Sequence, residues 1–334
     1  MRASPDLATA PPANGRPLLE ATGLTVDFPG RLRAVDRLDL RVDRGEILAI
    51  VGESGSGKSV SALALMRLVP APGRIVAGNV QLDGRDLLQL PEQELAAVRG
   101  RRIGLILQNP RAALNPSLQI GVQLTRTLRV LGREATPDKL HELLRRVGFP
   151  EPERIARSYP HELSGGMCQR ACLALALAGG PDLLIADEPT TALDVAVQAR
   201  VLRLLVATAR QDRSAMILVT HDMALVKAVA DRVVVLYGGV VQEEGPVDEV
   251  IGRPRHPYTR ALVAAIPDPD RPVRRLAQIP GHATPVLAGS RGCRFAARCP
   301  QVEARCRDIE PPVVVGEAGS WARCHLLQPI RAAA

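Results

Sequence analysis

Several stretches of the chain alternate apolar and polar residues, whereas others are almost wholly apolar. Alternation over 18–28 and 36–45 is typical of strands with one buried face. Continuous apolar runs are typical of strands buried on both faces, and they occur at 45–52, 102–108, 182–187, 215–221 and 232–241. Helical spacing of apolar residues occurs at 59–69, 123–147 and 193–211. Strands that alternate with helices predict an α/β fold with a mostly parallel sheet.

The distribution of residue types divides the 334-residue chain into three predicted parts. Residues 1–17 are rich in Pro, Ala and polar residues and lack the apolar core of a secretory signal, so we expect a disordered leader. Residues 18–252 carry the strand and helix patterns and predict one large domain, with a helical subdomain at about 109–180. Residues 253–334 are Pro- and Arg-rich, then Cys-containing, and predict a small C-terminal extension. No apolar run reaches the roughly 20 residues of a transmembrane helix.

The chain is basic, with 43 Lys and Arg residues against 35 Asp and Glu residues and a formal net charge of +8. Such a charge can attract nucleic acid or an anionic membrane surface. Aromatic residues make up only 2% of the chain, and no dense basic run is interleaved with them. We therefore interpret the charge as a background property and expect no nucleic-acid partner.

A glycine-rich sequence, GESGSGKS at 52–59, lies between a predicted buried strand and a predicted helix. It fits the phosphate-binding motif G-x-x-x-x-G-K-[ST] in the context that this motif needs, which argues against an ordinary Gly/Ser turn. Glycines permit backbone conformations that a Cβ would block, and the loop N–H groups can then surround phosphates. We expect Lys58 to neutralise the β- and γ-phosphates and Ser59 to bind Mg²⁺. The other loop residues expected to contact the nucleotide are Gly52, Ser54, Gly55, Ser56 and Gly57.

Two acidic residues stand at the end of another predicted buried strand. Asp187 is the last residue of the apolar run at 182–187, and Glu188 follows it. Ligands of open α/β sheets bind at the carboxyl ends of the strands, so we expect both side chains beside the glycine-rich loop. Asp187 would hold the Mg²⁺ shell, and Glu188 would polarise an attacking water. A solvated acidic turn is the alternative interpretation.

Three more residues complete the predicted site. His221 ends the predicted strand at 215–221 and can contact the γ-phosphate or orient the water and Glu188, so we group it with Lys58 and Glu188 as catalytic. Gln108 ends the predicted strand at 102–108 and can reach Mg²⁺ or the water. Phe28 is expected to stack on an adenine ring, although a single Phe is more often part of a core.

A second anion site is predicted more than a hundred residues later. Ser164, Gly165 and Gly166 precede an Ala- and Leu-rich helical pattern, with Ser164 placed as the N-cap. The first N–H groups of such a helix can bind an anion. A simple helix cap is the alternative interpretation.

Six motifs together resemble those of ABC-type ATPases, in this order: GESGSGKS, Gln108, LSGGMCQR at 163–170, LLIADE at 183–188, TALD at 191–194 and His221. They correspond to the Walker A, Q-loop, signature, Walker B, D-loop and switch-histidine motifs. The resemblance covers about 18–245 and implies a P-loop NTPase cassette, a RecA-like α/β core with an inserted helical subdomain that uses ATP and Mg²⁺. It also implies that two cassettes face each other, so that Ser164, Gly165 and Gly166 would bind the ATP held by a partner.

Other features resemble the oligopeptide/dipeptide branch of ABC importers: Met167 in the signature, HPYTRALVAAIP at 256–267 and QIPG at 278–281. This resemblance implies an ATP-hydrolysing subunit that drives import of peptides or similar solutes from the cytoplasmic face of the membrane. The implied partners are a second ATPase subunit, expected to be a paralogue, two membrane permease subunits and an extracytoplasmic solute-binding protein. Cys168 replaces an Arg common in that branch, and we expect this change to affect only the outer face of its helix.

Four cysteines lie in the C-terminal extension, at Cys293, Cys299, Cys306 and Cys324. Their spacing is a poor match to zinc ribbons and ferredoxins, and shows only that four thiolates could converge. Relatives in the resembling branch bind a [4Fe–4S] cluster through such cysteines, which makes a cluster the leading interpretation, with zinc or free thiols as alternatives. Without an export signal, we expect no disulfides.

Two other functions are compatible with parts of the sequence. An ABC-type ATPase acting on DNA, in repair or chromosome maintenance, would explain the basic charge, but such proteins carry long insertions, and only 128 residues separate Lys58 from Asp187. A non-enzymatic binding module would place the function in the cysteine tail. The presence of both Glu188 and His221 argues against that module.

Overall fold

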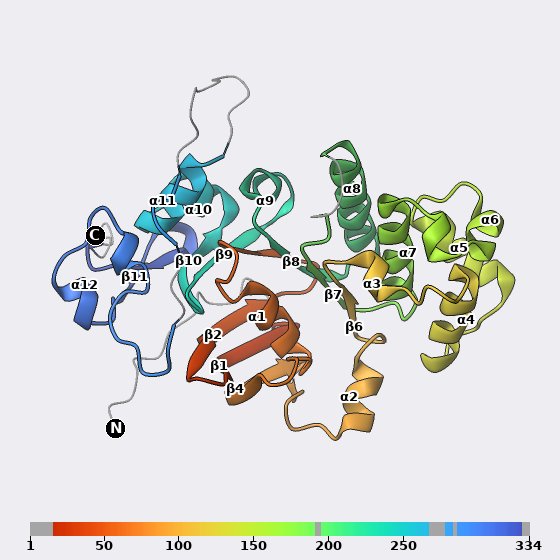
Figure 1. Cartoon of the computed structure of the whole chain (residues 1–334), viewed down its shortest axis with the longest axis horizontal. Coiled ribbons are helices and arrows are strands. Elements are labelled where there is room, and N and C mark those ends of the chain that lie inside the picture. Colours follow the sequence, from red (N-terminus) through yellow and green to blue (C-terminus); the bar gives the residue numbers. More distant parts are fainter. Residues whose placement is uncertain (1–15, 191–194, 267–277, 283–285, 329–334) are drawn as a thin grey trace.

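Two sheets organise the chain. The computed structural model describes residues 16–190, 195–266, 278–282 and 286–328. The larger sheet has the strand order β11-β12-β10-β9-β3-β8-β7-β6, and the smaller has the order β2-β1-β4-β5. Figure 1 shows the helical subdomain at one end of an elongated molecule and the C-terminal residues at the other. The predicted leader lies almost entirely outside the described residues.

Parallel strands form the centre of the larger sheet: β3 (Ile47–Val51), β6 (Ile103–Ile106), β7 (Leu183–Asp187), β8 (Ala215–Thr220) and β9 (Arg232–Tyr237). Every residue of β3, β7 and β8 is buried, which explains their continuous apolar sequences. Successive side chains face opposite sides of the sheet: Ile47 and Ala49 join one core cluster, and Leu48 joins the other.

The smaller sheet is antiparallel and consists of β1 (Leu19–Phe28), β2 (Leu32–Val42), β4 (Arg74–Leu82) and β5 (Arg85–Asp86). The first two strands were expected from their alternation. The third, β4, was not predicted, because most of its residues are exposed or half-buried and only Val80 and Leu82 are buried. Helix α1 (Lys58–Leu65) precedes β4 in the chain, and helix α2 (Glu92–Val98) follows β5. One core cluster contains residues of α1 and of both sheets.

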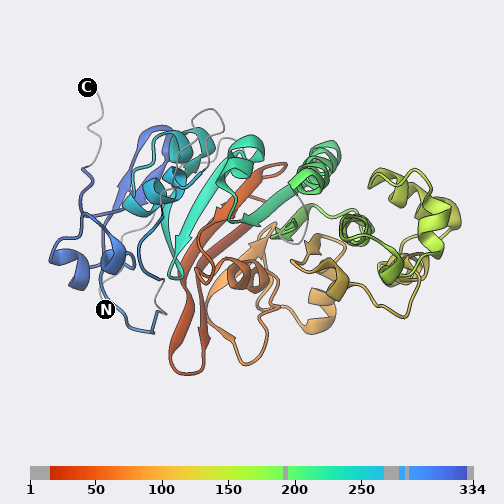
Figure 2. The ribbon, with the colours of Figure 1, turned by 45° about the horizontal axis from the view of Figure 1, so that its top comes forward.

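Within 109–180 every secondary-structure element is helical, as expected for this subdomain. The helices are α3 (Pro110–Ala113), α4 (Ile120–Val130), α5 (Pro137–Arg146), α6 (Pro152–Arg157), the short 3₁₀ turn η1 (Pro160–Glu162) and α7 (Gly165–Leu177). Local sequence sets their starts: Thr136 caps α5 by accepting a hydrogen bond from the Lys139 N–H, and Pro137 follows it. Figure 2 shows these helices packed together beyond the edge of the sheet.

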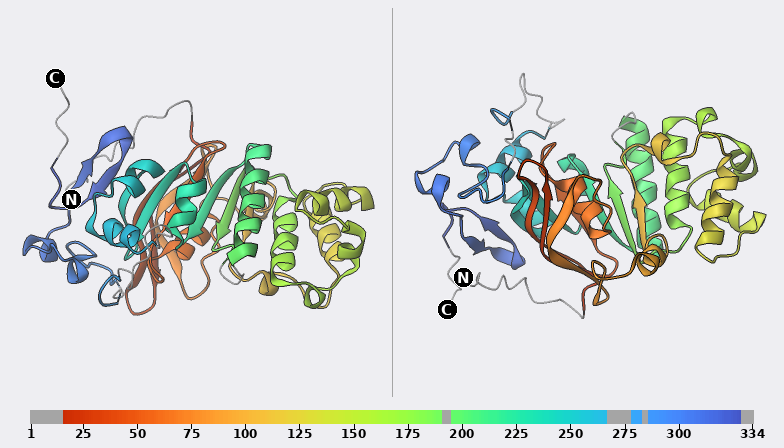
Figure 3. Two further views of the ribbon diagram at one scale, coloured as in Figure 1. Left: turned by 90° about the horizontal axis from the view of Figure 1, so that it is seen from above. Right: turned by 60° about the horizontal axis from the view of Figure 1, so that its bottom comes forward.

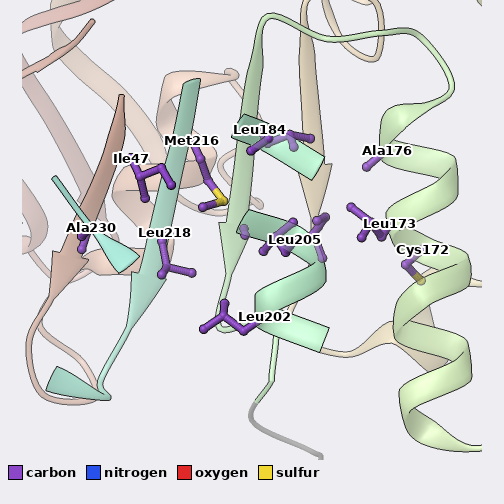
Figure 4. Packing of buried hydrophobic residues seen from close by; sticks show 14 of the residues in the cluster. Ile47, Cys172, Leu173, Ala176, Leu184, Leu202, Leu205, Met216, Leu218 and Ala230 are labelled. Atoms are coloured by element: carbon purple, nitrogen blue, oxygen red, sulfur yellow. The ribbon is translucent and has the colours of Figure 1, made fainter. Parts of the chain in front are cut away.

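The main core lies between the parallel strands and helices α7, α8 (Val195–Asp212) and α9 (Met223–Val229). Figure 4 shows Leu202 and Leu205 of α8 pointing toward the strands and Leu173 of α7 pointing toward α8. This apolar layer holds the carboxyl ends of β3, β7 and β8 in fixed positions along one edge of the sheet. No helix among the described residues is both long and apolar enough to cross a membrane.

The apolar run at 232–241 forms two strands rather than the one predicted. Gly238 and Gly239 have φ angles of 56° and 74°, so the chain reverses there and β10 (Val240–Pro246) returns antiparallel to β9. Helices α10 (Val247–Gly252) and α11 (Pro257–Ala264) follow, then η2 (Ala296–Arg298), α12 (Arg305–Asp308), β11 (Val313–Val315), η3 (Glu317–Gly319) and β12 (Trp321–Arg323).

The last two strands attach the C-terminal residues to the main sheet. β12 pairs with β10, and β11 pairs with β12, both antiparallel. Figure 3 shows this region against the side of the molecule opposite the helical subdomain. The extension predicted at 253–334 therefore continues the sheet of the large domain, and the division at residue 252 stays a prediction.

Candidate active site

The glycine-rich loop at 52–57 joins β3 to α1 and packs closely on neighbouring backbone. Gly52 has a φ of 152°, and a Cβ there would lie 2.2 Å from the Leu236 carbonyl oxygen. Gly57 has a φ of 102° and caps α1, and a Cβ there would lie 2.4 Å from the Ala34 carbonyl oxygen. Both positions therefore require glycine, and β2 and β9 fix the path of the loop.

Lys58 is the first residue of α1, and its side chain turns back into the loop. The Nζ donates hydrogen bonds of 2.9 Å to the carbonyl oxygens of Gly52 and Glu53. The side chain is buried, which lowers the pKa of Lys58, while the negative charges of Glu188 and Asp187 oppose this effect. A positive charge is thus held inside the loop, where an anion would sit.

Ser59, the second residue of α1, contacts Asp187, the last residue of β7. The Ser59 hydroxyl donates a 2.9 Å hydrogen bond to Asp187 Oδ1. Burial raises the pKa of Asp187, and the hydrogen bond from Ser59 acts in the opposite direction. The pair supplies hydroxyl and carboxylate oxygens, the donor types that Mg²⁺ prefers.

Glu188 contacts two other predicted site residues. Gln108 Nε2 donates a 2.9 Å hydrogen bond to Glu188 Oε2, and His221 Nδ1 lies 3.4 Å from Glu188 Oε1. Glu188 has a φ of 44°, an unfavourable backbone conformation for a residue with a Cβ. Strained backbone of this kind concentrates at functional sites, because the surrounding structure must hold it in place. Here the Glu188 N–H donates to the Val219 carbonyl oxygen of β8 at 2.9 Å.

The remaining predicted nucleotide contacts lie in or near the loop. Ser54 and Gly55 are exposed, whereas Ser56 is buried and its hydroxyl has no hydrogen-bond partner among the described residues. Phe28 ends β1 and packs on the core cluster that contains β1 and α1, next to Gly73. Its predicted stacking on adenine stays a prediction.

The second predicted anion site forms the start of α7. Ser164 is the N-cap, and its hydroxyl accepts a 3.3 Å hydrogen bond from the Met167 N–H. Gly166 is buried, and a Cβ there would lie 2.6 Å from Val197 Cγ1 of α8. Figure 1 shows α7 and α1 on either side of strands β7 and β8. The two anion sites thus belong to different parts of this chain, and the TALD segment at 191–194 lies outside the described residues.

Cys168 was expected on the outer face of its helix, and this prediction is wrong. Its side chain is fully buried, and its thiol lies 3.4 Å from the Pro160 carbonyl oxygen. Helix α7 packs against α3, α4, α5 and α8, which leaves little of its surface exposed. Burial also raises the pKa of the neighbouring Cys172 to about 12, so both residues are core thiols.

The four cysteines of the extension line one cavity, together with His256 and His325. All six cysteines of the chain are described as free thiols. The cavity has a volume of about 10 Å³, close to the space of a single water. Among the described residues no group of three or more His, Cys, Asp or Glu side chains could hold a metal ion. The prediction of a [4Fe–4S] cluster at Cys293, Cys299, Cys306 and Cys324 brings together residues that do line one cavity, but the described structure gives no support for the cluster itself.

Three residues in or beside the loop were not predicted as part of the site. Glu53 occupies a variable position of the phosphate-binding motif, and its carboxylate forms an ion pair with Arg298 of the extension. Tyr258 accepts a hydrogen bond from the Glu53 N–H at 2.8 Å. Tyr258 belongs to HPYTRALVAAIP, which signalled only a family resemblance, and Arg298 gave no signal of its own.

Comparison with known proteins agrees with this geometry. The family described as "ABC transporter" matches residues 35–191, and the family "Oligopeptide/dipeptide transporter, C-terminal region" matches residues 242–306. The dipeptide transport ATP-binding protein DppD of Escherichia coli is 41% identical over 92% of this chain and 96% of its own length. The oligopeptide transport ATP-binding protein OppD of Bacillus subtilis is 42% identical over 93% of this chain and 89% of its own.

A solved structure supports the fold. The ATP-binding cassette MJ0796, in a dimeric post-hydrolysis state with bound ADP and Pi, superposes with a TM-score of 0.61 at 28% identity. The similarity covers 69% of this chain and 98% of that one.

Proposed function

The chain belongs to the ABC transporter family of ATP-binding subunits, and from this premise we propose that it hydrolyses ATP to drive import of peptides or related small solutes through membrane permeases. Its similarity to the dipeptide and oligopeptide transport ATP-binding proteins extends over most of the chain. The alternative of an ATPase acting on DNA has no support from these relatives. The observation that carries the proposal is the contact of Glu188 with both Gln108 and His221, beside the loop that holds Lys58.

The proposed chemistry is phosphoryl transfer from ATP to water. Such a reaction needs positioning and charge neutralisation rather than a covalent intermediate. Lys58 would neutralise the β- and γ-phosphates, which compete with the loop carbonyls for its Nζ. Glu188 would accept a proton from the attacking water, and His221 would respond to the γ-phosphate beside it. The backbone N–H groups of the loop, from Gly52 to Gly57, would hold the phosphates.

Magnesium fits the residues present at this edge of the sheet. Ser59, Asp187 and Gln108 offer hydroxyl, carboxylate and amide oxygens, and the first two already touch each other. When bound there, Mg²⁺ would supply positive charge that neutralises the phosphates. Gln108 donates to Glu188 through Nε2, which leaves its Oε1 as the atom that could ligate a cation.

The second anion site suggests a dimer with shared nucleotide sites. Ser164, Gly165 and Gly166 begin α7, whereas this chain's own loop precedes α1, so we propose that the three residues bind the γ-phosphate held by a partner cassette. The similar cassette MJ0796 is dimeric in its ADP- and Pi-bound structure. Closed pairs would form with ATP and separate after hydrolysis, because whatever binds only the closed state stabilises it.

We propose an assembly for this chain that its similarity to peptide transport ATP-binding proteins supports. A second ATPase subunit, expected to be a paralogue, would complete the dimer. Two permease subunits would form the membrane channel at whose cytoplasmic face this chain docks, and an extracytoplasmic binding protein would deliver the solute. No step of the proposed function uses the thiol-lined cavity.

Reconstitution tests the proposal. The two permeases of the proposed assembly, with both ATPase subunits, would be placed in lipid vesicles with the binding protein and a mixture of short peptides. We expect ATP-dependent peptide uptake that stops when Lys58→Ala replaces the native subunit. Uptake that continues with this variant, or ATP hydrolysis that binding protein and peptide never stimulate, would contradict the proposal.

A further inference from the structure

The C-terminal extension makes a buried ion pair with the phosphate-binding loop. Arg298 Nη1 and Nη2 donate to the two carboxylate oxygens of Glu53 at 2.5 and 3.0 Å. The Arg298 side chain is only 6% exposed and that of Glu53 is 29% exposed. Two parallel hydrogen bonds between planar groups fix their relative orientation as well as their distance. The pair joins residues 245 positions apart, so its role is not local to either segment.

Glu53 is held at three points. Its N–H donates to the Tyr258 hydroxyl at 2.8 Å, and its carbonyl oxygen accepts from Lys58 Nζ at 2.9 Å. The same carbonyl accepts from the Ser56 N–H at 3.2 Å, which closes a turn inside the loop. With Arg298 on the carboxylate, every polar group of Glu53 has a partner. Two of these partners come from the extension, one from the loop and one from the start of α1.

Arg298 is itself firmly placed. Its guanidinium also donates to the Pro280 carbonyl oxygen at 2.8 Å and to the Tyr237 hydroxyl at 3.2 Å. The Glu53 carboxylate raises the pKa of Arg298 above its ordinary value, so the charge is permanent. The guanidinium carbon lies 5.8 Å from the centre of the Tyr237 ring. A side chain with so many partners acts as a rigid support.

An aromatic cluster backs this support. The chain has only three Tyr and three Phe residues, and Tyr237, Tyr258 and Phe295 meet here. Their ring centres lie 4.6 to 5.3 Å apart, in edge-to-face or tilted pairs. Tyr237 ends β9, Tyr258 lies in α11 and Phe295 lies just before η2. The cluster therefore packs the extension against β9 of the central sheet, and its Tyr258 contacts the loop at Glu53.

A second connection between the extension and the loop ends at Ser56. Arg294 of the extension pairs with buried Asp36 at 2.6 Å. The Asp36 N–H donates to the Gly239 carbonyl oxygen, and the Gly239 N–H donates to the Ser56 carbonyl oxygen at 3.0 Å. The loop is thus supported from the extension at both Glu53 and Ser56.

We propose that the C-terminal extension positions the phosphate-binding loop for ATP, with Arg298 acting through Glu53 as a positioning residue. This inference rests on the proposed function, because it needs ATP as the ligand of the loop. Three of the six loop residues are glycines, which lose much backbone entropy when ordered. A loop that is already ordered binds its ligand without that entropic penalty. The extension thereby couples its own folding to nucleotide affinity.

The experiment uses the full chain and compares Glu53→Gln, Arg298→Gln, the double variant and Arg298→Lys. Equilibrium affinity for Mg·ATP is measured by calorimetry, and steady-state hydrolysis gives kcat and KM. We expect each Gln variant to weaken ATP binding about tenfold or more, with kcat much less affected because Lys58, Asp187 and Glu188 are unchanged. The double variant should bind Mg·ATP no more weakly than either single variant, and Arg298→Lys should recover part of the Mg·ATP affinity.

A matched control is Arg305→Gln, an exposed arginine of the same extension that pairs with Glu303 and has no described contact with the loop. Thermal unfolding without nucleotide shows whether each variant folds. The inference is overturned if folded Glu53→Gln and Arg298→Gln variants bind ATP as the native chain does, or if their effects add in the double variant. A native chain that does not bind ATP would instead overturn the proposed function, and this inference with it.

Discussion

The hydroxyl of Ser59 donates a 2.9 Å hydrogen bond to the Oδ1 of Asp187, across 128 positions of sequence. Ser59 lies in α1 directly after the loop, and Asp187 ends β7. The two meet because β8 pairs in parallel with both β3 and β7, so that these strands end at one edge of the sheet. Hydroxyl and carboxylate thus form a pair of oxygen donors beside the phosphate-binding loop.

The Asp187→Asn variant tests this pair as a magnesium site. The amide keeps the size of the side chain but removes the negative charge that faces the cation. We expect hydrolysis to fall by about 10²- to 10³-fold, since charge stabilisation at the phosphates depends on the metal. Steady-state turnover over a range of Mg²⁺ concentrations measures this effect. The control is Asp138→Asn, because Asp138 is exposed in the first turn of α5. Native turnover by Asp187→Asn would refute the assignment.

The Glu188→Gln variant separates binding from hydrolysis. Gln keeps the volume of the side chain and can keep a hydrogen bond to Gln108, but it accepts no proton from water. We expect turnover to fall by about 10²- to 10⁴-fold while ATP affinity stays close to that of the native chain. Rapid mixing under single-turnover conditions and calorimetry measure the two quantities. Glu151→Gln is the control, because Glu151 is exposed in the helical subdomain.

A variant that hydrolyses ATP at the native rate without the Glu188 carboxylate would remove the general base from the mechanism. A variant that loses binding and turnover together would instead make Glu188 a structural residue. Its strained backbone makes this second outcome worth measuring, since φ is 44° at this position.

His256 makes stability depend on pH. Its ring is buried, caps α11 by accepting from the Tyr258 N–H, and has a pKa lowered to about 4 by burial and by Arg260. The unfolded chain binds a proton near pH 6.5 and the folded chain only near pH 4. The contribution of His256 is therefore full above pH 6.5 and is lost as the pH falls toward 4.

The matched variant is His256→Asn, because Asn also caps helices but does not titrate. Between pH 7 and pH 5 the native chain should lose about 2 kcal/mol of stability that the variant keeps. Denaturant unfolding at both pH values gives the two slopes. Buried Glu243, which accepts from the His256 N–H, titrates in both proteins and so cancels in the comparison. Equal slopes would show that His256 contributes nothing to the pH dependence.

The sequence predicted the central sheet well, because β3, β7 and β8 are buried on both faces and their residue types reflect this. It failed where local sequence does not record the surroundings. Strand β4, RIVAGNVQL, is mostly exposed or half-buried and does not alternate regularly, and burial of Cys168 depends on helices packed around α7. The Arg298–Glu53 pair could not be foreseen either, since neither residue reveals a partner 245 positions away.

Ser164 gives a test of the shared nucleotide site. The hydroxyl caps α7, so Ser164→Ala would remove about 1 kcal/mol of stability whatever its function. Ser164→Asp and Ser164→Asn both keep a capping oxygen, but only Asp adds a negative charge where a partner's γ-phosphate would lie. We expect both variants to unfold at nearly the native temperature. Ser164→Asp alone should lower turnover of the assembled importer by about tenfold or more, because like charges would then meet in a desolvated site.

Mixed assemblies sharpen this test. When Ser164→Asp is combined with a native partner cassette, hydrolysis should be impaired at the partner's nucleotide, while the loop of the variant chain still binds ATP with native affinity. The reason is spatial: Figure 1 shows α7, which Ser164 caps, and α1, which follows the loop, on either side of β7 and β8. Equal turnover of the Asp and Asn variants would show that Ser164 is only a helix cap. Loss of ATP affinity in the variant chain itself would place the second anion site within one cassette rather than between two.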